Sequence, residues 1–179
     1  MKISDLLHKL EKSEIFKNFR KDNETKDAFF CAAFIILNFK QSMFEYSLDF
    51  RNDKNIFTFK VPFADTQNSE ITMFKEDLLE GRKPLEKVEE EKAKQIRVDI
   101  DDLKLFAEKE IKNNKITQQL EEIIAVLQSQ EGKLVWNLTC MASAFTIINM
   151  IIDAETGKII KFDKKNLMDF VSVKKPEKN

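Results

Sequence analysis

The sequence has few of the residues from which enzymes most often build catalytic and cofactor sites. It contains one histidine, His8, and three glycines, Gly81, Gly132 and Gly157, which lie far apart. A phosphate-binding loop or a dinucleotide-binding turn needs closely spaced glycines, so both are excluded. A histidine-based metal site, triad or general acid would depend on His8 alone. We therefore expect no catalytic residue, no metal and no cofactor.

Cysteine is also scarce: Cys31 and Cys140 lie in apolar segments, and no CxxC spacing is present. Thiols in such segments behave as small hydrophobic residues. Charges interrupt the apolar residues of the first 19 positions, so no signal-peptide core is predicted there. We expect a cytoplasmic protein with two free thiols, and a disulfide between them is the alternative.

The longest nearly uncharged stretch is residues 134–152, and it is not uniformly apolar. Asn137 and Asn149 are among the polar residues that divide it, and β-branched residues are frequent. Such a pattern favours two buried strands of a hairpin over a membrane span. We therefore expect no membrane-spanning segment.

The charges nearly cancel, with 30 Lys and Arg against 31 Asp and Glu, but they are unevenly placed. Residues 1–21 hold six basic against three acidic residues, and residues 158–179 hold seven against three, so residues 22–157 carry a net charge of −8. The 42% hydrophobic content and the 16 phenylalanines predict a folded chain. Basic ends on an acidic body could bind RNA, a ribosome or an anionic membrane surface.

The first half reads as helices followed by strands. One helix is expected from Ser4, followed by a kink or a second short helix that starts near Ser13. Apolar or alternating residues then predict three strands, and a weaker pattern of apolar residues predicts a helix after them. The strands are residues 28–38, 44–50 and 55–61, the helix is residues 69–80, and a charged solvated helix or arm covers residues 85–95.

The second half begins with a helix capped by Asp99 or Asp101. A second helix is predicted by the spacing of Ile116, Leu120, Ile123, Ile124 and Leu127, with Gly132 at its C-terminal cap. Strands are expected over residues 133–141, 144–152 and 159–162, and an apolar segment over residues 167–173.

The order of elements predicts an α+β fold with an internal duplication. At an offset of 102, residues 47–60 lie over residues 149–162 as strand, turn and strand. We expect two related units, each a helix and then three antiparallel strands, joined into one sheet or packed face to face. The units are residues 1–64 and 99–173, with a charged connection over 65–98 and a tail over 174–179. The expected core includes Phe34, Ile36, Phe57, Leu120, Ile123, Leu127, Trp136, Ile148 and Ile159.

The second half resembles a known type of unit. Its aliphatic helix, the segment GKLVWNLTC and the D-A-x-T-G-K turn at residues 153–158 are similar to a PepSY-type unit over residues 99–163. The first half departs from this pattern, because residues 51–54 replace the turn and contain no glycine. The resemblance implies a helix on a small antiparallel sheet. It also implies a non-catalytic role, such as regulating a peptidase or sensing a ligand.

Candidate site residues are few. The acidic groups at residues 89–91 and at Asp99, Asp101 and Asp102 could form an acid and base pair or a cation site, but the aspartates are better explained as helix caps. Asn137 and Asn149, in otherwise apolar strands, could bond each other or face a ligand. The residues expected to bind a partner are Trp136, Asn137, Asn149, Lys158 and Lys161.

These observations predict a non-enzymatic, cytoplasmic binding or regulatory protein. Its partner, a protein or peptide, would bind a sheet face or an edge strand. The alternative is an RNA- or ribosome-associated factor that uses the basic ends, which requires their lysines to share one face. A hydrolase that uses Asp or Glu is a third class. Homodimerisation through edge strands is a further expectation.

Overall fold

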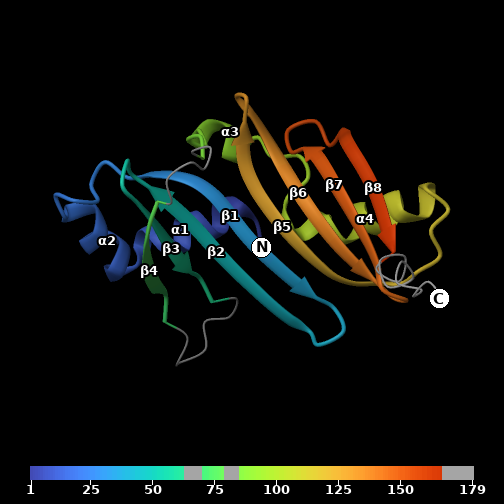
Figure 1. Ribbon diagram of the computed structural model, residues 1–179. Helices are drawn as coiled ribbons and strands as arrows, with labels where there is room; N and C mark the ends of the chain where they lie inside the picture. Colours follow the sequence, from blue (N-terminus) through green and yellow to red (C-terminus); the bar gives the residue numbers. More distant parts are fainter. Residues whose placement is uncertain (63–69, 79–84, 167–179) are drawn as a thin grey trace, which may run out of the picture.

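The fold is an α+β architecture with one antiparallel sheet of eight strands, in the order β4-β3-β2-β1-β5-β6-β7-β8 (Figure 1). The computed structural model describes residues 1–62, 70–78 and 85–166. The helices of this part of the chain are α1 (Ile3–Lys12), α2 (Glu14–Lys21), α3 (Glu90–Lys94) and α4 (Ile100–Asn113). Its strands are β1 (Phe29–Asn38), β2 (Met43–Arg51), β3 (Asn55–Lys60), β4 (Thr72–Asp77), β5 (Leu120–Gln130), β6 (Lys133–Ala142), β7 (Thr146–Asp153) and β8 (Ile159–Asn166).

The centre of the sheet is the antiparallel pair of β1 and β5, which joins the two halves of the chain. The ladder runs from Ala32 opposite Gln128 to Asn38 opposite Glu122. β2, β3 and β4 extend the sheet on one side, and β6, β7 and β8 extend it on the other. The halves therefore form one continuous sheet, and each contributes four strands rather than the expected three.

The predicted offset of 102 superimposes strands that occupy different places. Residues 47–60 lie in β2 and β3, the second and third strands from the centre of their half. Residues 149–162 lie in β7 and β8, the third and fourth strands of theirs. The two hairpins are thus not equivalent in the sheet, and this alignment does not establish a duplication.

The helices cover one face of the sheet and enclose the core against it (Figure 1). Phe16 and Phe19 of α2 pack on the strands, with ring centroids 5.1 Å apart for Phe16 and Phe50 and 5.1 Å apart for Phe19 and Phe59. α4 buries one side through residues spaced at three or four positions, as predicted. Its buried residues are Ile100, Leu103, Ala107 and Ile111.

The predicted helix over residues 116–127 is wrong, because this segment contains β5. A bulge between Leu120 and Glu122 places Leu120 and Ile123 on the same face of the strand, which produces a helix-like spacing of three. The strand is also apolar on both faces, so its alternation is hidden. Gly132 does not cap a helix. Glu131 and Gly132 have φ of +52° and +73° and make the two-residue turn between β5 and β6.

The predicted helix over residues 69–80 is also wrong in its described part, which forms the edge strand β4. All six residues of β4 are exposed, so the spacing of Ile71, Phe74 and Leu78 did not reflect a buried helical face. The predicted starts of two other helices, near Ser13 and at Asp99, are confirmed. Ser13 Oγ accepts from Phe16 N at 3.3 Å in α2, and Asp99 caps α4. The first helix begins at Ile3, one residue before Ser4.

Most of the expected core is confirmed, but Phe34 and Ile36 are exceptions. A bulge between Phe30 and Ala32 resets the alternation of β1, so Ala33, Ile35 and Leu37 face the helices. Phe34 is 37% exposed on the opposite face. Residues 134–152 form most of β6, a turn and β7, as predicted, and no described helix has the length and apolar character needed to cross a bilayer. The predicted apolar segment at 167–173 lies outside the described residues.

Candidate functional site

The sheet face turned away from the helices, here called the open face, is the candidate site. No described helix covers this face, which is turned toward the reader in Figure 1. Five of the eight large hydrophobic residues that are exposed in the described chain contribute to it. These are Phe34, Met43, Phe74, Met141 and Ile160. Exposed apolar side chains that gather on one face are typical of an interaction surface.

The middle of the open face carries an apolar stripe, defined here as Phe34, Ile36, Ile124, Val126 and Ile151. Phe34 lies opposite Val126, and Ile36 lies opposite Ile124, across the central β1–β5 ladder. Ile151 lies two strands farther on, beyond Asn137. Phe34 is 37% exposed and the other four side chains are partly accessible, although they occupy the centre of the sheet. The helices leave this area uncovered because they bury the other face.

Two amides that the sequence singled out, Asn137 and Asn149, border the stripe. Asn137 lies between Val126 and Ile151, and Asn149 lies opposite Thr139. Asn149 Oδ1 accepts from Thr139 Oγ1 at 3.2 Å, so the two amides do not bond each other. The buried Asn137 Nδ2 has no acceptor among the described residues. The amides therefore place polar groups beside the apolar stripe.

A pocket of about 480 Å³ opens at the end of the open face where the turn between β5 and β6 lies. Its floor comes from β5, β6 and β7, and Leu85 and Glu86 supply part of its wall. Ile151 belongs both to this pocket and to the apolar stripe, so the two features are continuous. The remaining lining residues are Gln128, Ser129, Gln130, Glu131, Lys133, Val135 and Ile160.

The wall of this pocket fills a gap in the sheet. β1 and β5 stop pairing beyond Ala32 and Gln128, and residues 86–88 enter between their ends. Val88 N donates to Phe30 O at 2.9 Å on one side. On the other, Glu86 accepts from Ser129 Oγ at 2.9 Å and from Gly132 N at 3.1 Å. Glu86 thus fixes this segment to the β5–β6 hairpin.

The other three predicted partner-binding residues lie in different surroundings. Trp136 is fully buried on the helix-covered face, and its Nε1 donates to Val98 O at 2.8 Å. Because its side chain is fully buried, Trp136 packs in the core and cannot contact a partner. Lys158 is exposed in the β7–β8 turn, and Lys161 is exposed on the open face opposite Ile151. Only Asn137, Asn149 and Lys161 therefore share the open face.

The D-A-x-T-G-K turn has a structural explanation. Asp153 Oδ1 accepts from Thr156 N at 2.8 Å and from Glu155 N at 3.1 Å. Burial raises the pKa of Asp153, but these hydrogen bonds outweigh it and hold the pKa below its usual value. Gly157 has φ of +72°, which favours glycine. The turn is also anchored by Arg97 N, which donates to Ala154 O at 2.8 Å.

The other titratable groups lie in separate places in the described chain. His8 is exposed on α1, and no group of three or more potential metal ligands is found among the described residues. Burial raises the pKa of Asp49, whose carboxylate accepts from Thr58 Oγ1 at 2.7 Å. Burial also raises the pKa of the Cys31 and Cys140 thiols to about 12. Both cysteines are free.

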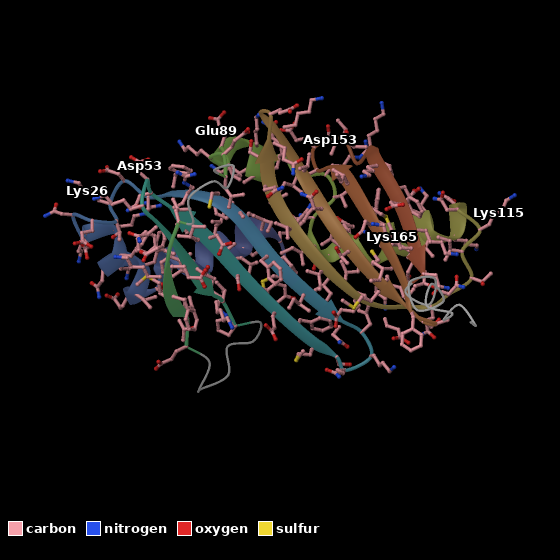
Figure 2. The ribbon with its side chains drawn as sticks, in the orientation of Figure 1. Lys26, Asp53, Glu89, Lys115, Asp153 and Lys165 are labelled. Carbon is pink, nitrogen blue, oxygen red and sulfur yellow. The ribbon has the colours of Figure 1, made fainter. Side chains whose placement is uncertain are left out.

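The two basic segments lie at opposite sides of the molecule. α1 and α2 pack on the helix-covered face beside β1–β3, whereas β8 is the edge of the other half (Figure 1). Lys161 and Lys165 are on the open face, and Lys165 lies toward the lower end of β8 (Figure 2). Lys161 and Lys165 therefore lie on a different face from α1 and α2, whereas Lys164 lies opposite the buried Ile148 on the helix-covered face.

No protein-family profile and no curated protein sequence matches the chain. A solved structure with a similar fold is that of a "putative lipoprotein" from Clostridium difficile 630, with a TM-score of 0.52 and 15% sequence identity. The similarity covers 87% of this chain and 97% of the other. At this identity the likeness concerns the fold alone.

Proposed function

We propose that this protein is a non-enzymatic binding or regulatory protein whose open face receives a protein or peptide partner. The observation that carries the proposal is the apolar stripe at the centre of a sheet face that no described helix covers. Burying such side chains contributes about 25 cal/mol for each Å² removed from water. The bordering amides and the pocket would add specificity through hydrogen bonds and shape.

We also propose that the halves are related units, aligned by their place in the sheet and not by the offset of 102. Each half places helices before four antiparallel strands, and their first strands, β1 and β5, pair at the centre. On this proposal residues 99–163 would be a PepSY-like unit whose helix is α4, because the aliphatic segment that suggested the helix is β5. The D-A-x-T-G-K turn would then be a structural signature of the unit and not a binding site. A cytoplasmic location remains a prediction from the sequence.

The proposal is tested by affinity capture with variants of the stripe. Phe34→Thr and Ile36→Thr, made together, remove apolar surface while keeping residues that favour strands. The control is Leu105→Gln, which removes an apolar side chain that is 72% exposed on α4. We expect a partner that the wild-type protein and the control retain and that the stripe variant loses. Equal retention by all three proteins, or turnover of a substrate by the purified protein, would contradict the proposal.

A further inference from the structure

The outer edge of β8 is open for strand pairing in the described structure. β8 pairs with β7 on its inner side, and no described strand lies on its outer side. Alternate backbone N–H and C=O groups of an edge strand point away from the sheet. An extended peptide can add to such an edge, because main-chain hydrogen bonds supply affinity and side chains supply specificity.

The charges of β8 indicate the chemistry of such a peptide. Residues 158–166 contain four lysines and one acidic residue, Asp163. Within the described residues, no carboxylate forms an ion pair with Lys161 or Lys164. Lys165 Nζ lies 3.7 Å from Asp163 Oδ2. This single ion pair leaves the edge with excess positive charge. Lys161 and Lys165 both project on the open face, four residues apart.

The opposite edge of the sheet does not offer the same complementarity. β4 carries Lys75, Glu76 and Asp77, so its charges are mixed. Lys75 lies 3.8 Å from a Glu24 carboxylate oxygen, and Asp77 Oδ1 accepts from Asn55 Nδ2 at 2.8 Å. These contacts occupy two of its three charged side chains. The edge at β8 is therefore the one with unbalanced charge.

The bulge in β8 adds an apolar anchor next to the charged edge. The register of β7 and β8 shifts between Ile151 and Ile152, which leaves Ile160 without an opposite residue. Ile160 is 54% exposed and lines the pocket together with Val135 and Ile151. A side chain of an added strand could therefore lie on Ile160 and continue into the pocket.

We propose that β8 receives an extended acidic segment of a partner protein as a ninth strand of the sheet. This inference rests on the proposed function and names the class of partner. Acidic side chains of the segment lie beside Lys161 and Lys165, and an uncharged residue lies beside Asp163. An apolar residue of the segment packs on Ile160 at the edge of the pocket.

The test uses a synthetic, end-blocked peptide that matches the eight residues of β8 in length. It has two glutamates four positions apart, and valine and threonine elsewhere. Binding is measured by fluorescence anisotropy with the full chain. One control peptide carries lysine in place of each glutamate. A second control peptide carries methyl groups on alternate backbone nitrogens. The protein variant is Lys161→Glu with Lys165→Glu, and its control is Lys26→Glu with Lys54→Glu, which changes the net charge equally at exposed positions far from β8.

We expect the acidic peptide to bind the wild-type protein and the control with the same affinity. Reversing both lysines should weaken binding by about twofold to thirtyfold, because exposed ion pairs contribute about 0.2 to 1 kcal/mol each and 1.4 kcal/mol is tenfold. The lysine peptide should bind more weakly, and the methylated peptide should not bind.

Equal binding by the Lys161 and Lys165 variant, or equal binding of the acidic and lysine peptides, would overturn the inference. So would a β8-dependent dimer, or binding of single-stranded RNA at these lysines, when the acidic peptide does not bind. The proposed function has a separate readout. If the captured partner is lost from the stripe variant but kept by the β8 variant, the open face binds the partner and the ninth-strand inference fails.

Discussion

Asp99 Oδ1 accepts hydrogen bonds from the backbone N–H of Ile3 at 3.0 Å and of Ile100 at 2.7 Å. One buried carboxylate therefore satisfies the first residue of α1 and the first residue of α4. The initial amides of a helix have no partner within the helix, so this contact ties the starts of both helices together. It connects the helix layers of the two halves beneath the continuous sheet.

Replacing this carboxylate should destabilise the protein. Asp99→Ala leaves the amides of Ile3 and Ile100 without their acceptor, and we expect the free energy of unfolding to fall by about 1 to 3 kcal/mol. The measurement is urea denaturation at pH 7. The control is Asp53→Ala in an exposed turn, where a change within about 0.5 kcal/mol is expected. Equal losses for the two variants would show that Asp99 does not hold the helices.

The pH dependence of stability should report the burial of Asp99. Burial raises its pKa above the ordinary value of 3.8, although hydrogen bonds from Ile100 and Ile3 lower it in part. The folded state therefore favours the protonated carboxyl of Asp99. The stability gained from this protonation is complete below pH 3.8 and is lost as the pH rises through the raised pKa of the folded state.

Asp99→Asn keeps an acceptor oxygen but does not titrate. The free energy of unfolding of the wild type minus that of this variant should therefore decrease as the pH is raised from about 3 to 7. Denaturation curves at intervals across this range measure the difference. A difference that stays constant, or that increases with pH, would contradict the assigned effect of burial.

Two glycines in turns should differ in how they tolerate a side chain. Gly132 and Gly157 both have positive φ, so alanine at either position costs about 1 to 2 kcal/mol. A Cβ at Gly132 would meet nothing within 4 Å, whereas a Cβ at Gly157 would lie 3.2 Å from Val98 Cγ2. Gly157→Ala should therefore lower the melting temperature more than Gly132→Ala. The opposite order would show that the turn at residues 153–158 is not fixed against Val98.

The two cysteines should be unreactive in the folded protein. Both thiols are buried, and burial raises their pKa to about 12, so the thiolate that reacts is scarce at pH 8. We expect slow labelling by a disulfide reagent in native buffer and two equivalents of labelling in denaturant. Rapid labelling of one thiol in native buffer would indicate an accessible cysteine that the fold does not contain.

The sequence predicted six of the eight described strands, including the central β1, and read the central β5 and the edge strand β4 as helices. β6 and β7 were recognised because polar residues divide the uncharged stretch at 134–152 and β-branched residues are frequent in it. β5 was read as a helix because it is apolar on both faces and its bulge gives Leu120 and Ile123 the spacing of a helix turn. Bulges depend on pairing with neighbouring strands, so a single sequence does not reveal them.

The same limit applies to the candidate site. Asn137 and Asn149 were identified because polar residues in apolar strands are conspicuous, and Lys161 was named as part of the basic C-terminal segment. Phe34 and Ile36 were assigned to the core because the first strand is apolar throughout, and only the bulge before Ala32 decides which side chains face the helices. The apolar stripe was therefore missed. A signal was present in the unbroken apolar run itself, since a central strand with two apolar faces needs cover on both.

Hydroxyl-radical footprinting of the side chains, with and without the captured partner, tests directly whether the partner binds the open face. We predict that Phe34, Met43 and Met141, all exposed on the open face, lose much of their oxidation in the complex, while Leu105 on α4 is oxidised equally in both samples. Protection of Leu105 with unchanged oxidation of the three open-face residues would place the partner on the helices and contradict the account.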